Sequence, residues 1–105
     1  MIRIVLIEDG HLMREWLGRS LSSRGHDVRR FERAGDALAA VIADAPDVIV
    51  SDIKMPGMSG IEFGRMLRAR AIHVPIVFMT ANPDARVQSD ARALGSRWFL
   101  HKPFH

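Results

Sequence analysis

Three acidic residues and one lysine each follow directly after an apolar, strand-like run. They are Glu8, Asp9, Asp52 and Lys102. If these runs are neighbouring parallel strands, the four side chains meet at one edge of a single sheet. Carboxylates are the ligands that hard divalent cations prefer, and a lysine beside them can hold a phosphoryl oxygen. The pattern therefore suggests a site for metal-assisted phosphoryl chemistry.

The order of the elements supports such a meeting place. Strand-like runs are expected at 2–7, 26–31, 48–50, 74–79 and 97–101, and the more polar 26–31 run is expected at the sheet edge. Helical patterns are expected at 11–24, around 37–42, from a cap at Ser59 to Leu67, and from Asn82 to Leu94 with Pro83 in the first turn. One apolar stripe of the first helix is formed by Leu12, Met13, Trp16, Leu17 and Leu21. This alternation predicts one α/β domain over residues 1–105, with a parallel sheet between helices. Ligands of such sheets bind beyond the carboxyl ends of the strands. Asp9, Asp52, Thr80 and Lys102 all stand at such ends.

Composition narrows the class of protein. Apolar residues make up 48% of the chain, which is enough for a core, and the absence of cysteine excludes disulfides and thiolate metal sites. The net charge of +3 comes from dispersed basic residues, so we expect a solvated surface and no direct binding of nucleic acid by this domain. No run is long enough to span a membrane, and no signal peptide is seen, so a cytoplasmic protein is expected.

Four motifs in order resemble the receiver domain of two-component response regulators. They are Ile7-Glu8-Asp9, the segment from Asp52 to Gly60, Met79-Thr80-Ala81, and the segment from Gly95 to Phe104. Each motif alone is weak, but their order and spacing over essentially the whole chain are specific. The resemblance implies a flavodoxin-like (CheY-like), doubly wound sheet of five parallel strands in the order 2-1-3-4-5, which places the first and third strands side by side.

The resemblance also implies roles for the acidic residues. Asp52 is implied to be the phosphoacceptor, whose carboxylate attacks phosphorus. Glu8, Asp9 and Asp52, with the backbone carbonyl of Lys54, are the implied ligands of Mg²⁺ or Mn²⁺. Two carboxylates about 4 Å apart repel each other by roughly 4 kcal/mol at an effective dielectric of about 20, so a cation is needed beside them.

Further roles follow from the same resemblance. Lys102 is implied to pair with a phosphoryl oxygen, and in the family the Lys102–Pro103 bond is a cis peptide that aims the lysine. Thr80 is implied to donate its hydroxyl to the phosphoryl group, and Phe99 to be the switch aromatic that turns inward as Thr80 moves.

Three loop positions complete the implied site. The backbone amide of Ala81 is expected to donate to the phosphate. Lys54 and Asn82 lie two residues past Asp52 and Thr80, where family members modulate the rate of hydrolysis. The implied function is a phosphorylation-controlled switch that receives its phosphoryl group from a sensor histidine kinase or a phosphotransfer protein.

Other functions were weighed against this interpretation. A flavodoxin needs a hydroxyl-rich phosphate loop where Glu8-Asp9 stands, a haloacid-dehalogenase phosphatase needs a second acid near Asp52, and no Walker A motif is present. We therefore expect no enzyme beyond self-phosphorylation and autodephosphorylation. A pseudo-receiver, which binds proteins without being phosphorylated, is the remaining alternative.

The chain departs from the family pattern at its end. It stops at His105, where the family usually continues into a fifth helix. A truncated piece, a part of a longer protein and a natural short form are three open interpretations. In a natural short form, the apolar face left by the missing helix would be covered by self-association, because large exposed apolar patches are rare.

Overall fold

The structure is a computed structural model, which describes residues 1–96 and 98–102. Strands and helices alternate along these residues. In chain order the elements are β1 (Arg3–Ile7), α1 (His11–Ser22), β2 (Asp27–Phe31), α2 (Ala34–Ala43), β3 (Val48–Asp52), α3 (Gly60–Ala69), β4 (Ile76–Thr80), α4 (Ala85–Ala93) and β5 (Phe99–His101). The alternation predicted from the sequence is confirmed.

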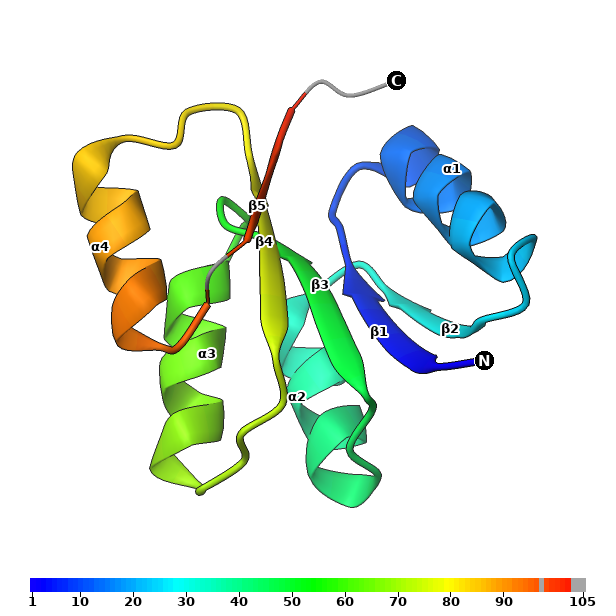
Figure 1. Ribbon diagram of the computed structural model, residues 1–105, viewed down its shortest axis with the longest axis horizontal. Helices are drawn as coiled ribbons and strands as arrows, with labels where there is room; N and C mark the ends of the chain where they lie inside the picture. The colour runs from blue at the N-terminus through cyan, green and yellow to red at the C-terminus, as the bar shows by residue number, and fades with distance from the viewer. Residues whose placement is uncertain (97, 103–105) are drawn as a thin grey trace.

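All five strands are parallel and lie in the order β2-β1-β3-β4-β5. The flavodoxin-like, doubly wound fold is therefore confirmed. The more polar 26–31 run is the edge strand β2, as its sequence indicated. Helices α2, α3 and α4 lie on one side of the sheet and α1 on the other (Figure 1). This arrangement leaves the carboxyl ends of β1, β3 and β4 beside one another.

Each face of the sheet has its own apolar core. The larger core joins β1, β3 and β4 to the three helices on that side, around fully buried residues such as Phe63, Leu67 and Phe78. The smaller core joins Leu6, Val50 and Met79 to Leu17 of α1. Successive residues along β1, β3 and β4 alternate between the two cores, as expected for a parallel sheet buried on both faces.

Two helix starts show how local sequence sets the boundaries. Helix α3 begins with a capping box, in which Ser59 Oγ accepts from the Glu62 amide at 3.1 Å, so the cap predicted at Ser59 is confirmed. Helix α4 begins later than expected. Its cap is Asp84, whose Oδ1 accepts from the Val87 amide at 2.9 Å. The prediction that Pro83 lies in the first turn was wrong, because the carboxylate cap satisfies the first amides of the helix one residue further on.

The apolar stripe predicted on α1 is only partly buried. Leu17 is buried in the smaller core, whereas Leu12 is 83% exposed and Trp16 is 46% exposed. Leu100 of β5, which pairs with the buried Met79, is 38% exposed. This face has one helix among the described residues, and self-association through it stays a prediction.

One arginine ties the amino-terminal edge of the sheet. Arg68 of α3 donates to the carbonyl oxygens of Leu94 at 3.0 Å, Ile72 at 2.7 Å and Val74 at 3.1 Å. It thereby joins α3, the loop before β4 and the end of α4, at the edge opposite the acidic residues. Within the described residues, no helix has the length and hydropathy needed to span a membrane.

Candidate functional site

Strand register brings the chemical residues together. Ile7 of β1 lies beside Ser51 of β3, so Glu8, just past β1, and Asp52, the last residue of β3, lie side by side. On the other side of β3, the Ile53 amide donates to the Met79 carbonyl at 3.1 Å. The Lys102 amide donates to the Thr80 carbonyl at 2.8 Å, which places β5 beside the end of β4. The edge predicted from the sequence therefore exists.

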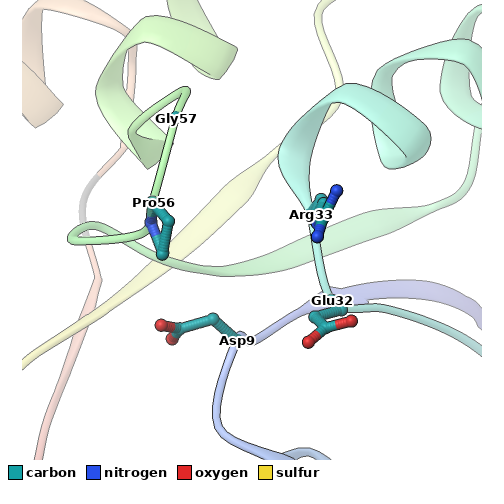
Figure 2. A pocket seen from close by; sticks show the side chains of 5 residues that line it. All are labelled: Asp9, Glu32, Arg33, Pro56 and Gly57. Carbon is teal, nitrogen blue, oxygen red and sulfur yellow. The ribbon is translucent and has the colours of Figure 1, made fainter.

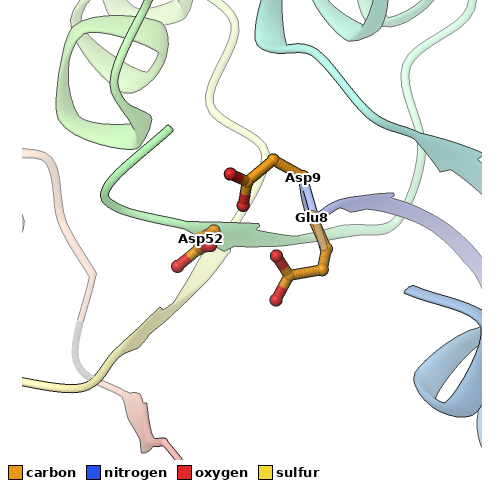
Figure 3. A group of neighbouring side chains, drawn as sticks. All are labelled: Glu8, Asp9 and Asp52. Atoms are coloured by element: carbon orange, nitrogen blue, oxygen red, sulfur yellow. The ribbon is translucent and has the colours of Figure 1, made fainter. Parts of the chain in front are cut away.

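The acidic residues form one cluster. Carboxylate oxygens of Glu8, Asp9 and Asp52 lie within 4.8 Å of one another. Figure 3 shows the three side chains converging from the ends of β1 and β3. Glu8 is 1% exposed and Asp52 is 6% exposed, whereas Asp9 is exposed to solvent. The cluster is thus buried on the side of the sheet and open on the side of Asp9.

Lysine 102 joins two of the three acids. Its Nζ forms an ion pair with Glu8 Oε1 and donates to Asp52 Oδ2 at 3.0 Å. The other oxygen of Glu8, Oε2, accepts from the Gly10 amide at 3.0 Å. Both oxygens of the buried Glu8 carboxylate are therefore partnered, as a buried charge requires.

Burial changes the acidity of the cluster. Loss of hydration raises the pKa of Asp52 to about 7; the hydrogen bond from Lys102 opposes this rise and the charge of Glu8 adds to it. Burial lowers the pKa of Lys102, but its hydrogen bonds to Glu8 and Asp52 outweigh burial and leave that pKa above its ordinary value. In the absence of a metal, Lys102 is thus the main group that supports an ionised Asp52.

A hollow of about 190 Å³ opens beside Asp52. Its lining is the set of loop and strand-end residues that the sequence singled out: Asp52, Lys54, Thr80, Ala81, Asn82 and Lys102. Thr80 is buried, and its Oγ1 accepts from the Asn82 amide at 3.1 Å, which leaves the hydroxyl hydrogen available to donate. A negatively charged group in this hollow would meet a lysine and a hydroxyl, and the amide of Ala81 stays a predicted donor.

A second hollow, of about 340 Å³, lies on the other side of Asp9. Figure 2 shows Asp9, which follows β1, beneath Pro56 of the loop after β3, and Glu32, which follows β2, beneath Arg33. Gly57 belongs to the same loop as Pro56 and also lines the hollow. Arg33 completes the lining. This space keeps the Asp9 carboxylate accessible to an ion that arrives from solvent.

A family model of the response regulator receiver domain matches residues 4–105. The chain belongs to this family. Curated relatives agree. The response regulator MprA of Mycolicibacterium vanbaalenii is 34% identical over 103 residues, which are 98% of this chain and 45% of that protein. The DNA-binding transcriptional regulator NtrC of Salmonella typhimurium is 34% identical over 99 residues, which are 94% of this chain and 21% of that protein. The receiver domain thus spans less than half the length of these curated relatives.

Solved receiver structures share the fold. Chemotaxis protein CheY4 of Vibrio cholerae superposes with a TM-score of 0.93 at 28% identity, covering 100% of this chain and 89% of that one. The non-phosphorylated HemR receiver domain of Leptospira biflexa gives a TM-score of 0.91 at 28% identity, covering 100% and 85%. Receiver domains are signalling domains of two-component systems, so phosphorylation-based signalling is the general function of this family.

The donor set of this receiver domain fits Mg²⁺, the metal typical of the family. It consists of carboxylate oxygens, one of them on the buried and fully partnered Glu8, and hard cations prefer such ligands. Glu8, Asp9 and Asp52 would hold the ion. The carbonyl of Lys54 stays a predicted fourth ligand, and Lys54 lines the hollow beside Asp52.

Two predictions concern Phe99, as the switch aromatic, and the peptide bond between Lys102 and Pro103. Phe99 is partly buried, packs on the larger core and lies with its ring centre 6.5 Å from that of Phe78. Its role as a switch stays a prediction. The prediction of a cis bond at Lys102–Pro103 lies outside the described residues.

Two residues of the site were missed from the sequence. Arg14 was counted among the dispersed basic residues, yet its guanidinium donates to the Glu8 carbonyl at 2.9 Å. His101 Nε2 lies 3.1 Å from the Ala81 carbonyl and ties β5 to the loop after β4. The only signal for Arg14 was its position five residues after Asp9, which places it in the first turn of α1.

Proposed function

We propose that this receiver domain accepts a phosphoryl group on Asp52 from a histidine kinase or phosphotransfer protein, and that the reaction depends on Mg²⁺. The hollow that brings Asp52, Thr80 and Lys102 together is the observation that carries the proposal. In it Asp52 lies beside the ammonium group of Lys102 and the hydroxyl of Thr80, which suits a group that carries negative charge on several oxygens.

The proposed step is a transfer between two acceptors. An Asp52 carboxylate oxygen bonds to phosphorus while the bond from phosphorus to the donor's imidazole nitrogen breaks, and the electron pair of that bond stays on the nitrogen. Lys102 Nζ lies 3.0 Å from Asp52 Oδ2, close enough to donate to a phosphoryl oxygen and stabilise the negative charge on it during the transfer. The bound metal would supply electrostatic neutralisation of the carboxylates and the phosphoryl group.

The signal is proposed to pass through Thr80 and Phe99. In the unphosphorylated state Thr80 Oγ1 accepts from the Asn82 amide. On phosphorylation its hydroxyl is proposed to donate to a phosphoryl oxygen, and the amide of Ala81 would donate from the same segment. Such contacts would stabilise one of two pre-existing arrangements, with Phe99 filling the space left beside Thr80.

The lifetime of the phosphorylated state is proposed to depend on Lys54 and Asn82. Both line the hollow at its rim, where a side chain can admit or exclude the water that hydrolyses the acyl phosphate.

The test is Mg²⁺-dependent labelling of the purified protein by acetyl phosphate, followed by mass spectrometry. We expect the wild type to gain the mass of one phosphoryl group and Asp52→Asn to gain none, because the amide is not a nucleophile at this site. Asp90→Asn, which changes a half-buried acid paired with Arg65 at 3.6 Å and remote from the hollow beside Asp52, should label like the wild type. Absence of labelling in the wild type, with beryllofluoride also failing to bind, would favour the pseudo-receiver.

A further inference from the structure

We propose that Arg14 is a positioning residue, which holds the loop between β1 and α1 in the shape that lets Glu8 and Asp9 bind the metal. The inference rests on the proposed function, because it concerns the affinity of the same acidic cluster for Mg²⁺. Arg14 itself is not in the cluster. It acts through the backbone of the residues that are.

Arg14 contacts all three carbonyl oxygens of the loop. Its Nη1 donates to the Glu8 carbonyl at 2.9 Å and lies 3.4 Å from the Asp9 carbonyl. Its backbone amide donates to the Gly10 carbonyl at 2.9 Å. The guanidinium therefore holds the carbonyls of residues 8 and 9, while the Gly10 carbonyl accepts an ordinary helical hydrogen bond of α1 that does not depend on the side chain at position 14. Residues 8 to 10 are the whole connection between the last residue of β1 and the first residue of α1.

The direction of the two carboxylates depends on this backbone. Glu8 reaches Lys102 through one oxygen and the Gly10 amide through the other, so a rotation of the Gly10 peptide would displace the carboxylate. Asp9 is exposed, and packing does little to hold its side chain. A change in the loop would thus move both carboxylates relative to Asp52, and metal affinity is sensitive to groups that orient the ligands.

The planar fork of the guanidinium matters as well as its charge. Nη1 reaches the two carbonyls, while Nη2 lies 3.3 Å from His11 Nδ1 and keeps the plane fixed against α1. Lysine carries the same charge but not the fork geometry. Arg14→Lys therefore separates a requirement for geometry from a general effect of positive charge near the acids.

The chain offers a matched control. Arg68 also donates to three carbonyl oxygens and ties loops together, but at the opposite edge of the sheet. Arg68→Ala should lower stability at least as much as Arg14→Ala, because both remove hydrogen bonds from carbonyls that are partly buried. If stability alone governed the site, the two variants would affect the metal equally.

The experiment is a calorimetric titration of each folded variant with Mg²⁺ alone, without phosphodonor. We expect the Kd to rise about tenfold or more in Arg14→Ala, by a smaller factor in Arg14→Lys, and not at all in Arg68→Ala. Thermal unfolding of the same samples reports stability separately. Labelling by acetyl phosphate should recover in Arg14→Ala when Mg²⁺ is raised in proportion to the new Kd.

A Kd in Arg14→Ala within a factor of about two of the wild-type value would overturn the inference, as would an equal loss in Arg68→Ala. Should Arg14→Ala fail to fold, Arg14→Lys decides, because a wild-type Kd in that variant removes the requirement for the fork. If the wild type itself binds no Mg²⁺, the proposed metal site fails, and the inference fails with it.

Discussion

Asp52→Asn is expected to make the metal-free protein more stable than the wild type at neutral and alkaline pH. The reason is that the fold holds this carboxylate buried next to Glu8, which raises its pKa to about 7. An asparagine occupies the same space without a charge. The variant should therefore lose the ability to be phosphorylated and gain stability, as expected where a functional group is held in a costly environment.

The sign of the pH dependence follows from the pKa of Asp52 in the folded protein, about 7, and its ordinary value of 3.8 in the unfolded chain. Between about pH 4 and pH 7 the folded state keeps a proton on Asp52 that the unfolded chain has already released, so the stability of the wild type falls as pH rises through this window. Above pH 7 both states are ionised and the cost is complete. The rise of the Asp52 pKa from its ordinary value to about 7 corresponds to about 4 kcal/mol. This is the upper bound on the stability gained by Asp52→Asn at pH 8.

The measurement is urea unfolding in EDTA at several pH values between 4 and 8. The difference in free energy of unfolding between Asp52→Asn and the wild type should be smallest near pH 4 and largest near pH 8. Asp90→Asn, at an ion pair whose arginine is exposed to solvent, should change stability by about 1 kcal/mol or less. Identical unfolding curves for Asp52→Asn and the wild type at pH 8 would contradict the idea that burial of the ionised Asp52 is costly.

The sequence predicted the fold well where one local signal acted alone. The alternation of apolar runs with helical stripes gave the element order, and Ser59 marked a helix start because the capping box is a local interaction with Glu62. The start of α4 was misjudged because Pro83 and Asp84 are both suited to a first turn. Which of them caps the helix depends on how the chain leaves β4.

The site was predictable for the residues whose side chains line the hollow itself. Asp52, Thr80 and Lys102 stand at strand ends, and the parallel topology brings strand ends together. Arg14 and His101 act on backbone carbonyls of other segments. Such contacts leave no pattern in a single sequence, since any basic or polar residue in the right place can make them. The exposure of Leu12 was missed for a similar reason, because an apolar stripe does not say how much of it a sheet will cover.

Gly60→Ala is expected to lower stability by about 3 kcal/mol and to impair labelling of Asp52. Gly60 is buried in the first turn of α3, where its amide donates to the Ile53 carbonyl at 2.9 Å. A Cβ at this position would lie 2.3 Å from the Asp52 carbonyl oxygen and 3.1 Å from Ile53 Cα. These are backbone atoms, so relief requires α3 or the end of β3 to move, and the end of β3 carries the phosphoacceptor.

Two other helical glycines turn this expectation into a graded series. A Cβ on Gly35 of α2 would meet nothing within 4 Å, so Gly35→Ala should stabilise the protein by about 0.5–1 kcal/mol through helix propensity. A Cβ on Gly18 of α1 would come within 2.1 Å of Arg30 Nε, but this side chain can swing away at the loss of its 3.5 Å ion pair with Glu15. Urea unfolding should thus rank the variants Gly35→Ala, Gly18→Ala, Gly60→Ala from most to least stable. Acetyl phosphate labelling should be impaired in Gly60→Ala alone, because Gly60 is the one of these three glycines whose added Cβ would meet the backbone of Asp52. Normal labelling of folded Gly60→Ala would show that the site tolerates a shift of that backbone.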